Sequence, residues 1–102
     1  MLLKRPLDLV GTMPENRVVG ERHPLTTEAE KVFTLELGSF YTNSVVIRDV
    51  GTGNILVKDV DYHLLGYNDK AAKECGGKQI DTIVAIVRSD VATAAVDYQA
   101  VG

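Results

Sequence analysis

The sequence predicts an all-β protein, an antiparallel β-sandwich of the immunoglobulin-like kind with about six to seven strands and at most one short helix. Two observations lead to this fold class. Short segments with a two-residue hydrophobic period, separated by turn-forming residues, fill the chain from residue 26 to residue 102. Residues 1–25 show no usable hydrophobic period, so we expect an extended N-terminal arm (1–25) followed by a sandwich domain (26–102).

The strands of the first half follow from alternation and from β-branched residues. VFTLEL at 32–37 alternates between two faces, as a half-buried strand does. Thr27 and Glu30, just before it, match a capping box and predict a brief helical turn. SVVIRDV at 44–50 is rich in β-branched residues and predicts the next strand.

A tight hairpin is expected directly after residue 50. Gly51, Thr52 and Gly53 lie between two apolar runs, and we expect the two glycines to supply positive φ angles in the loop. Ile55 and Val57 then begin the returning strand.

The second half contains two further strands, one ambiguous segment and a final strand. VDYHLLGY reaches residue 67, and residues 69–75 form either a short helix stopped by Gly76-Gly77 or a longer loop. QIDTIVAIVR at 79–88 is apolar on both faces, which predicts a central strand covered on both sides. The ending at 93–102 alternates and predicts a last strand with one wet face.

Composition and charge exclude several classes of partner. The chain has 102 residues, which fit one domain, and a net charge of −3 with a pI near 5.2, so we expect neither nucleic acid nor a membrane as a partner. A single cysteine, Cys75, permits no internal disulfide. Met1-Leu2-Leu3 runs directly into charged residues, without the apolar region of a signal peptide, and no apolar run is long enough to cross a bilayer. We therefore expect synthesis in a cytoplasm, unless the chain is carried out as part of something larger.

Few residues suggest chemistry. ECGGK resembles a phosphate-binding loop but has Ala72 and Gln79 where the motif requires glycine and a hydroxyl residue. His63, near Asp61 and twelve residues before Cys75, could be drawn as a base with a nucleophile. The alternative, which we favour, is that Asp61 caps a turn, His63 lies on an exposed strand face and Cys75 is a small buried residue. We expect no catalytic residues, no cofactor and no metal.

Three stretches together resemble a known group of proteins. LDLVGTMPENRVVGERHPL, GSFYTNSVVIRDVGTGNILVKDVDY and the terminal VDYQAVG are similar to β-sandwich domains in virion structural proteins of large tailed bacteriophages. Similar blocks occur there in neck, collar, tail and baseplate components. The resemblance implies a non-enzymatic assembly component of a virion, either a standalone form or a fragment of a longer chain, whose partners are other virion proteins and copies of itself.

This resemblance gives the arm a role, because a segment without a hydrophobic period can bury its valines along a neighbouring subunit. The expected interface residues of the arm are Val10, Met13, Asn16, Arg17, Val18, Val19 and Arg22. Removal of residues 1–24 should then leave a folded domain that no longer assembles. The alternative is an arm that folds back over its own sandwich. The second candidate function is a host-recognition or carbohydrate-binding module at a virion or cell surface.

Overall fold

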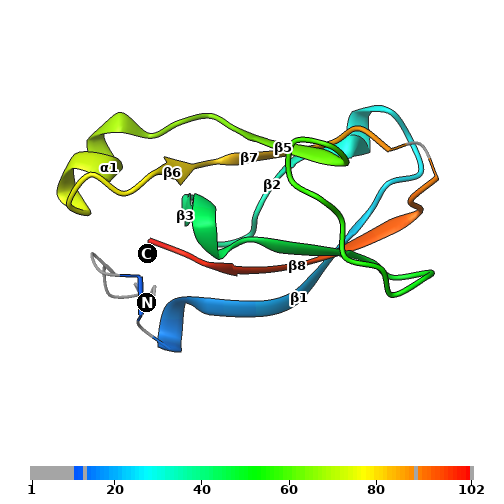
Figure 1. Ribbon diagram of the computed structural model, residues 1–102, viewed down its shortest axis with the longest axis horizontal. Coiled ribbons are helices and arrows are strands. Elements are labelled where there is room, and N and C mark those ends of the chain that lie inside the picture. Colours follow the sequence, from blue (N-terminus) through cyan, green and yellow to red (C-terminus); the bar gives the residue numbers. More distant parts are fainter. Residues whose placement is uncertain (1–10, 13, 89, 102) are drawn as a thin grey trace, which may run out of the picture.

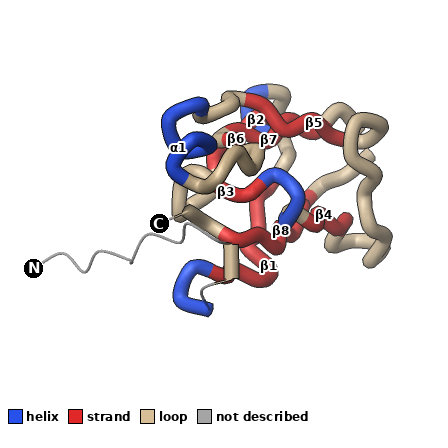
Figure 2. The backbone as a smooth tube through the Cα atoms, turned by 60° about the vertical axis from the view of Figure 1, so that its left-hand side comes forward, coloured by secondary structure: helices blue, strands red, loops and turns tan. Residues whose placement is uncertain are grey.

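A computed structural model describes residues 11–12, 14–88 and 90–101 of the chain. Within these ranges the protein is all-β, with eight strands in three antiparallel sheets. Figures 1 and 2 show two layers that face each other across the core. The predicted all-β, sandwich-like architecture is confirmed, and the strand count exceeds the expected number.

Two three-stranded sheets form the layers. Sheet A has the order β1-β8-β4, from the strands Arg17–Pro24, Thr93–Gln99 and Val46–Asp49. Sheet B has the order β2-β7-β5, from Val32–Thr34, Ile83–Ile86 and Tyr62–Leu65. The remaining elements are the short strands β3 (Phe40–Tyr41) and β6 (Ile80–Asp81), three 3-10 turns (Pro14–Asn16, Ala29–Lys31, Thr42–Ser44) and the helix α1 (Asp69–Glu74).

The core lies between the two sheets and is built by alternate residues of each strand. In β8 the side chains of Ala94, Val96 and Tyr98 are fully buried, and the residues between them are partly exposed. The Tyr98 ring meets Phe40 edge to face, with 6.3 Å between the ring centroids. The predicted last strand is confirmed, and its alternation holds for residues 93–98, but Gln99, which the sequence put on the wet face, is buried.

The hairpin after β4 lies where it was predicted, but only one of its two glycines has a positive φ. Gly53 has a φ of 75° and donates its N–H to the Asp49 carbonyl at 2.7 Å, whereas Gly51 has no positive φ. Instead, the Gly51 N–H donates to the Asp49 carboxylate at 2.9 Å. The return is a single bridge between Arg48 and Ile55, so the predicted strand at Ile55 is not a regular one.

The two predicted helical signals are both present in the structure. The Thr27 and Glu30 side chains each accept from the other's backbone N–H, at 3.3 and 3.1 Å, at the start of the turn Ala29–Lys31. Helix α1 begins with the Asn68 side chain accepting from the Ala71 N–H at 3.1 Å. It ends where the Gly77 N–H donates to the Ala72 carbonyl at 2.8 Å, so the short helix is the correct alternative.

The apolar segment 79–88 divides into β6 and β7 at Thr82. Strand β7 is the central strand of sheet B, as predicted. Val84 and Ile86 point into the core, but Ile83 and Ala85 are only partly buried and Val87 is exposed. The expectation that both faces are covered is therefore wrong for the described chain.

Residues 17–24 of the expected arm belong to the sandwich itself. They form β1, an edge strand of sheet A that pairs with β8 at six positions. Leu25, directly after β1, is buried in the core. These residues thus match the alternative in which the arm folds back over its own domain. The division between 1–25 and 26–102 does not separate two structural units. A chain without β1 should therefore lose its fold.

Because Val84 is buried and Val87 is exposed, truncation of the two side chains should lower the free energy of unfolding by different amounts. Val84→Ala removes fully buried methyl groups and should lower the free energy of unfolding by ~1–3 kcal/mol. Val87→Ala, the control, changes the same side chain at a position that is 54% exposed and should cost less than ~0.5 kcal/mol. Urea unfolding of both variants at low protein concentration measures the difference, and equal costs would contradict the observed orientation of β7.

Candidate functional site

A β-bulge in β1 decides which side chains of this strand face the core. Val19 and Gly20 both lie opposite Asp97 of β8, where the register shifts by one residue. Gly20 has a φ of 74° and donates its N–H to the Asp97 carboxylate at 2.7 Å. Because of the extra residue, Val18 before the bulge and Glu21 after it point into the sandwich, and the residues between them point out.

The bulge sends Glu21 into the seam between the two sheets, where its carboxylate is held by three donors. The Tyr98 hydroxyl donates to it at 2.6 Å, and the Glu36 N–H donates to both oxygens at 3.1 and 3.2 Å. The side chain is only 9% exposed. An ionised group at such a depth requires these partners, because burial removes its hydration.

His23 is the third partner of this carboxylate and joins it to sheet B. Its Nε2 lies 2.5 Å from a Glu21 oxygen, and its ring stacks on Phe33 of β2 with 4.0 Å between centroids. The Tyr98 hydroxyl also accepts from the Leu37 N–H at 3.2 Å. We call Glu21, His23 and Tyr98 the seam cluster, since it connects β1, β8 and the segment around β2.

The seam cluster perturbs the titration of Tyr98. Burial, and then the hydrogen bond to the Glu21 carboxylate, raise the pKa of Tyr98 above its ordinary value of 10.0. Phenolate formation at this position would place a second negative charge beside Glu21. The hydroxyl therefore keeps its proton in the folded protein at neutral pH.

The opposite, outward face of sheet A carries arginines at regular positions. Arg22 of β1 and Arg48 of β4 flank the partly exposed Ala95 of β8, so the three residues form one row across the sheet. The two arginine Cα atoms are two strand spacings apart, about 10 Å. In the part of the chain that the structure describes, neither they nor Arg17 form an ion pair. Three guanidinium groups are thus available on one flat surface.

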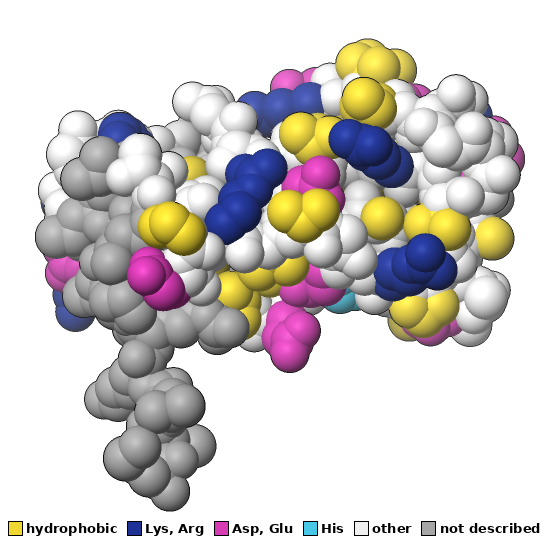
Figure 3. Space-filling view, turned by 90° about the horizontal axis from the view of Figure 1, so that it is seen from below, with side chains coloured by type: hydrophobic (Ala, Val, Ile, Leu, Met, Phe, Trp, Pro, Cys, Tyr) yellow, Lys and Arg dark blue, Asp and Glu magenta, His cyan; other side chains and the backbone are white. Residues whose placement is uncertain are grey.

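Exposed apolar side chains lie on the same face. Val19 is 73% exposed at the bulge, and Ile55 continues the row beside Arg48. Val57 shares the face with Ile55, because the residue between them is buried. Figure 3 shows basic and apolar side chains interleaved across this side of the molecule, with acidic side chains among them. We call this surface the arginine face; it consists of Arg17, Val19, Arg22, Val46, Arg48, Val50, Ile55, Val57, Ala95 and Asp97. The Asp97 carboxylate accepts the Gly20 N–H, so the face carries three arginines and one carboxylate.

The arginine face contains only part of the predicted interface. Arg17, Val19 and Arg22 lie on it, as the sequence suggested. Asn16 is fully buried and donates its amide to the Val101 carbonyl at 3.4 Å, and Val18 packs on the core. These two were therefore wrongly assigned to a surface, while Val10 and Met13 lie outside the described residues.

Sequence reasoning missed the residues that the other strands add to this face. Arg48, Ile55 and Ala95 come from β4, the hairpin and β8, and only the register places them beside Arg22. The available signal was the alternation within residues 44–50, which gives Arg48 the opposite face from buried Ile47.

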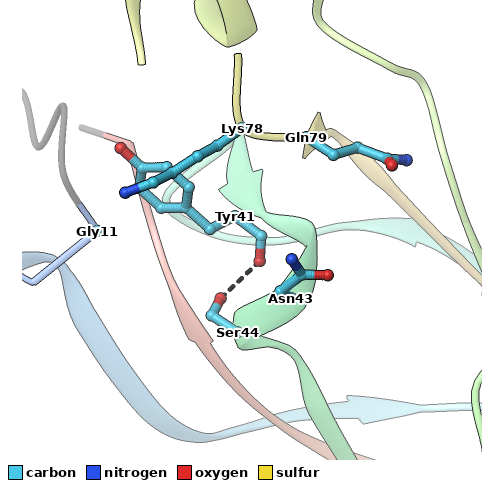
Figure 4. A pocket seen from close by; sticks show the side chains of 6 residues that line it. All are labelled: Gly11, Tyr41, Asn43, Ser44, Lys78 and Gln79. Carbon is cyan, nitrogen blue, oxygen red and sulfur yellow. Dashed lines mark hydrogen bonds between the residues drawn. The ribbon is translucent and has the colours of Figure 1, made fainter. Parts of the chain in front are cut away.

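A second surface feature is a pocket of about 310 Å³ between β3 and the segment before β6. Figure 4 shows Tyr41, Lys78 and Asn43 around it, with the Ser44 hydroxyl donating to the Tyr41 carbonyl at 2.6 Å. The Lys78 ammonium lies 5.7 Å from the centre of the Tyr41 ring. Its complete lining is Gly11, Tyr41, Asn43, Ser44, Lys78 and Gln79.

The residues considered for catalysis occupy separate places. The Asp61 carboxylate accepts from the Val57 N–H at 2.8 Å and so caps a turn, while His63 lies on the outer face of β5, 3.4 Å from Asp59. Cys75 is buried beside Ala72 and Ile80. Across the described ranges, no three His, Cys, Asp or Glu side chains gather as metal ligands would, and no helix has the length and apolarity of a membrane span.

The seam cluster predicts that Tyr98→Phe destabilises the protein. The change removes one donor to the buried Glu21 carboxylate and the acceptor for the Leu37 N–H, so the free energy of unfolding should fall by ~1–3 kcal/mol. Tyr67→Phe, at an exposed tyrosine, is the control and should leave stability unchanged. Chemical denaturation at neutral pH compares the two.

Tyr98→Phe should also change how the stability of the protein depends on pH in the alkaline range. The folded state retains the Tyr98 proton to higher pH than the unfolded chain, so this stability is present below pH 10.0 and is lost as the pH rises above it. Tyr98→Phe should therefore reduce the alkaline loss. Burial followed by the Asp59 and Asp61 charges also raises the pKa of Tyr62, so part of the loss should remain. An unchanged pH profile would contradict the role given to Tyr98.

Comparisons with known proteins do not assign the chain to a family. No protein-family model, no curated protein and no solved structure matches it. The arrangement of its own residues therefore carries the functional argument.

Proposed function

We propose that the chain is a non-enzymatic structural component of a tailed-phage virion, in the neck, collar, tail or baseplate, that docks on neighbouring subunits through the arginine face. The observation that carries the proposal is the row Arg22–Ala95–Arg48 on a sheet surface next to exposed valines and Ile55. Its two arginines form no ion pair with any other described residue.

The composition of this face suits a protein partner. Arginine is enriched in protein interfaces because its planar group both stacks on apolar surface and binds carboxylates through two hydrogen bonds. The exposed Val19, Ile55 and Val57 supply the apolar part that an interface core needs. The neighbouring surface should accordingly present carboxylates around an apolar centre.

Docking through the face is favoured over strand addition at the edge of β1. The bulge at Val19 and Gly20 interrupts the free edge, and Pro24 lacks the N–H that an added strand would need. Both features block edge-to-edge pairing. The outward side chains of the sheet are the surface that stays available.

The resemblance of the chain to phage virion domains supplies the kind of assembly. A virion repeats its subunits, so the proposed partners are other structural proteins of the particle and further copies of this chain, and its location is the virion after synthesis in the host cytoplasm. Nucleic acid and membranes are not proposed, because the arginines alternate with apolar residues and the chain carries a net charge of −3.

The test reverses two charges of the arginine face in the complete chain, because β1 is part of the fold and truncation would destroy it. Arg22→Glu with Arg48→Glu should reduce the amount of the protein in purified particles by about tenfold or more, since two hot-spot cations become like charges against an acidic partner. Lys70→Glu with Lys73→Glu makes the same change in net charge on α1 and should leave incorporation normal. Normal occupancy of the arginine variant, with circular dichroism confirming its fold, would contradict the proposal.

The pocket beside Tyr41 favours a second candidate function, a host-recognition or carbohydrate-binding module. Its lining includes Asn43 and Gln79 near a tyrosine, and the two amides are groups that hydrogen-bond sugar hydroxyls. This candidate predicts that soluble oligosaccharides shift the amide resonances of Asn43 and Gln79, and that Asn43→Ala abolishes the shifts. Thr52→Ala, in the distant hairpin, is the control. An absence of shifts across such a panel would remove this candidate.

A further inference from the structure

We infer that the arginine face of one copy packs on the outer face of sheet B of the next copy, so that identical chains stack head to tail. The inference rests on the proposed function for the first of these surfaces, and it goes beyond it by assigning the second surface and the partner. It is carried by two features of sheet B, an apolar outer face and an excess of carboxylates at one of its ends.

The outer face of sheet B is largely apolar, and His63 and Thr34 are the polar residues of its two central rows. The register places Val32, Ala85 and His63 in one row across the three strands. The next row contains Thr34, Ile83 and Leu65. Val32, Leu65 and the following Val87 are each about half exposed. No residue of these two rows carries a carboxylate, a lysine or an arginine, so the centre of the face can be buried without leaving a charge unpaired.

Carboxylates gather where β7 ends and its antiparallel neighbours begin. Glu28 precedes β2, Asp59 precedes β5 and Asp90 follows β7, and all three side chains are mostly exposed. Asp61 and Glu30 lie in the same segments. The end of sheet B has five carboxylates against three cations, Lys31, Lys58 and Arg88. Lys31 pairs with Glu28, and Arg88 pairs with Asp90 and Asp61, so this end has an excess of two carboxylates over these cations. This excess makes it the acidic counterpart of the arginine face.

The two surfaces match when one copy is placed above another in the same orientation. Asp90 lies just before the start of β8, and the row Arg22–Ala95–Arg48 crosses β8 near that start. If one copy is shifted without rotation, perpendicular to its sheets, its arginine row therefore comes to lie over the acidic end of sheet B of the other copy. Val19, Val46 and Ala95 then meet the apolar rows, at the spacing of about 10 Å that sheets keep when they pack face to face.

A contact between two different surfaces has a consequence that a symmetric dimer lacks. Each copy retains one unused surface, so the contact repeats and yields a ring if the rotation between copies closes, or a filament if it does not. The charge excess also makes the contact sensitive to salt. Both properties can be measured with the isolated full-length chain.

The experiment uses two matched alanines, each on the outward side of the central strand of its sheet. Ala95→Glu disables the arginine face, because the new carboxylate lies between Arg22 and Arg48 and pairs with them in place of a carboxylate of the partner. Ala85→Glu disables the face of sheet B, because it places an unpaired carboxylate at the centre of an apolar contact. Sedimentation velocity over a range of concentrations should show that the unmodified chain associates, more strongly at low salt. Each variant alone should associate at least ~10-fold more weakly. Asn43→Asp, which adds one negative charge outside both surfaces, should associate normally.

A mixture of the two variants gives the decisive result. The intact arginine face of Ala85→Glu can bind the intact sheet B face of Ala95→Glu, so the mixture should form a one-to-one dimer and nothing larger. A mixture that remains monomeric, a variant that associates as the unmodified chain does, or an unmodified chain that is monomeric up to its solubility limit each overturns the inference.

These outcomes are independent of the test of the proposed function. If the chain does not associate with itself but the Arg22 and Arg48 reversals still prevent incorporation into particles, the arginine face binds a different virion protein. If stacking occurs as described but the same reversals leave incorporation normal, the inference stands and the virion role fails.

Discussion

The buried carboxylate of Glu21 is the constraint on which the rest of the structure depends. It lies between the sheets, takes hydrogen bonds from Tyr98 and the Glu36 N–H, and contacts His23, which itself stacks on Phe33. Removal of one partner would leave a mostly buried carboxylate with fewer hydrogen bonds to replace its hydration. The carboxylate therefore holds the edge strand β1, the central strand β8 and the start of sheet B in one fixed arrangement, and N-terminal residues that lack apolar periodicity become part of the domain.

The bulge that turns Glu21 inward also makes the outer surface. One extra residue at Val19 and Gly20 reverses the alternation, so that Arg22 faces away from the core beside Ala95 and Arg48. Without the bulge, the same strand would bury Arg22 and expose Glu21. The stability of the domain and the chemistry of its arginine face thus follow from the same local irregularity, and the Asp97 carboxylate that receives the Gly20 N–H fixes it in position.

The sequence predicted the elements whose signals are local. Strand β8, the hairpin glycine Gly53, the capped helix α1 and the central position of β7 all follow from alternation, turn chemistry or capping residues. Strand β1 could not be read in this way, because its inward positions after the bulge are Glu21 and His23, which a hydrophobic pattern counts as exposed. Only part of the candidate site could be predicted, for the same reason. Arg17 and Arg22 lie in the N-terminal segment that the sequence suggested as an interface. Arg48 and Ala95 join them only through the register of distant strands.

The outward residues of β7 are apolar although they remain partly or largely exposed within the described part of the chain. A sandwich of two three-stranded sheets covers one face of each sheet, and on the other face of sheet B the described side chains of Val32, Leu65 and Val87 are about half exposed. Polar residues would suit such a face, yet Ile83, Ala85 and Val87 alternate there as regularly as Val84 and Ile86 do in the core. Exposed apolar surface of this kind weakens solubility without stabilising the monomer, and its regular placement is the reason for proposing that another protein surface covers it. In the proposed stack, the apolar rows supply most of the contact area and the arginines fix the orientation of the two copies.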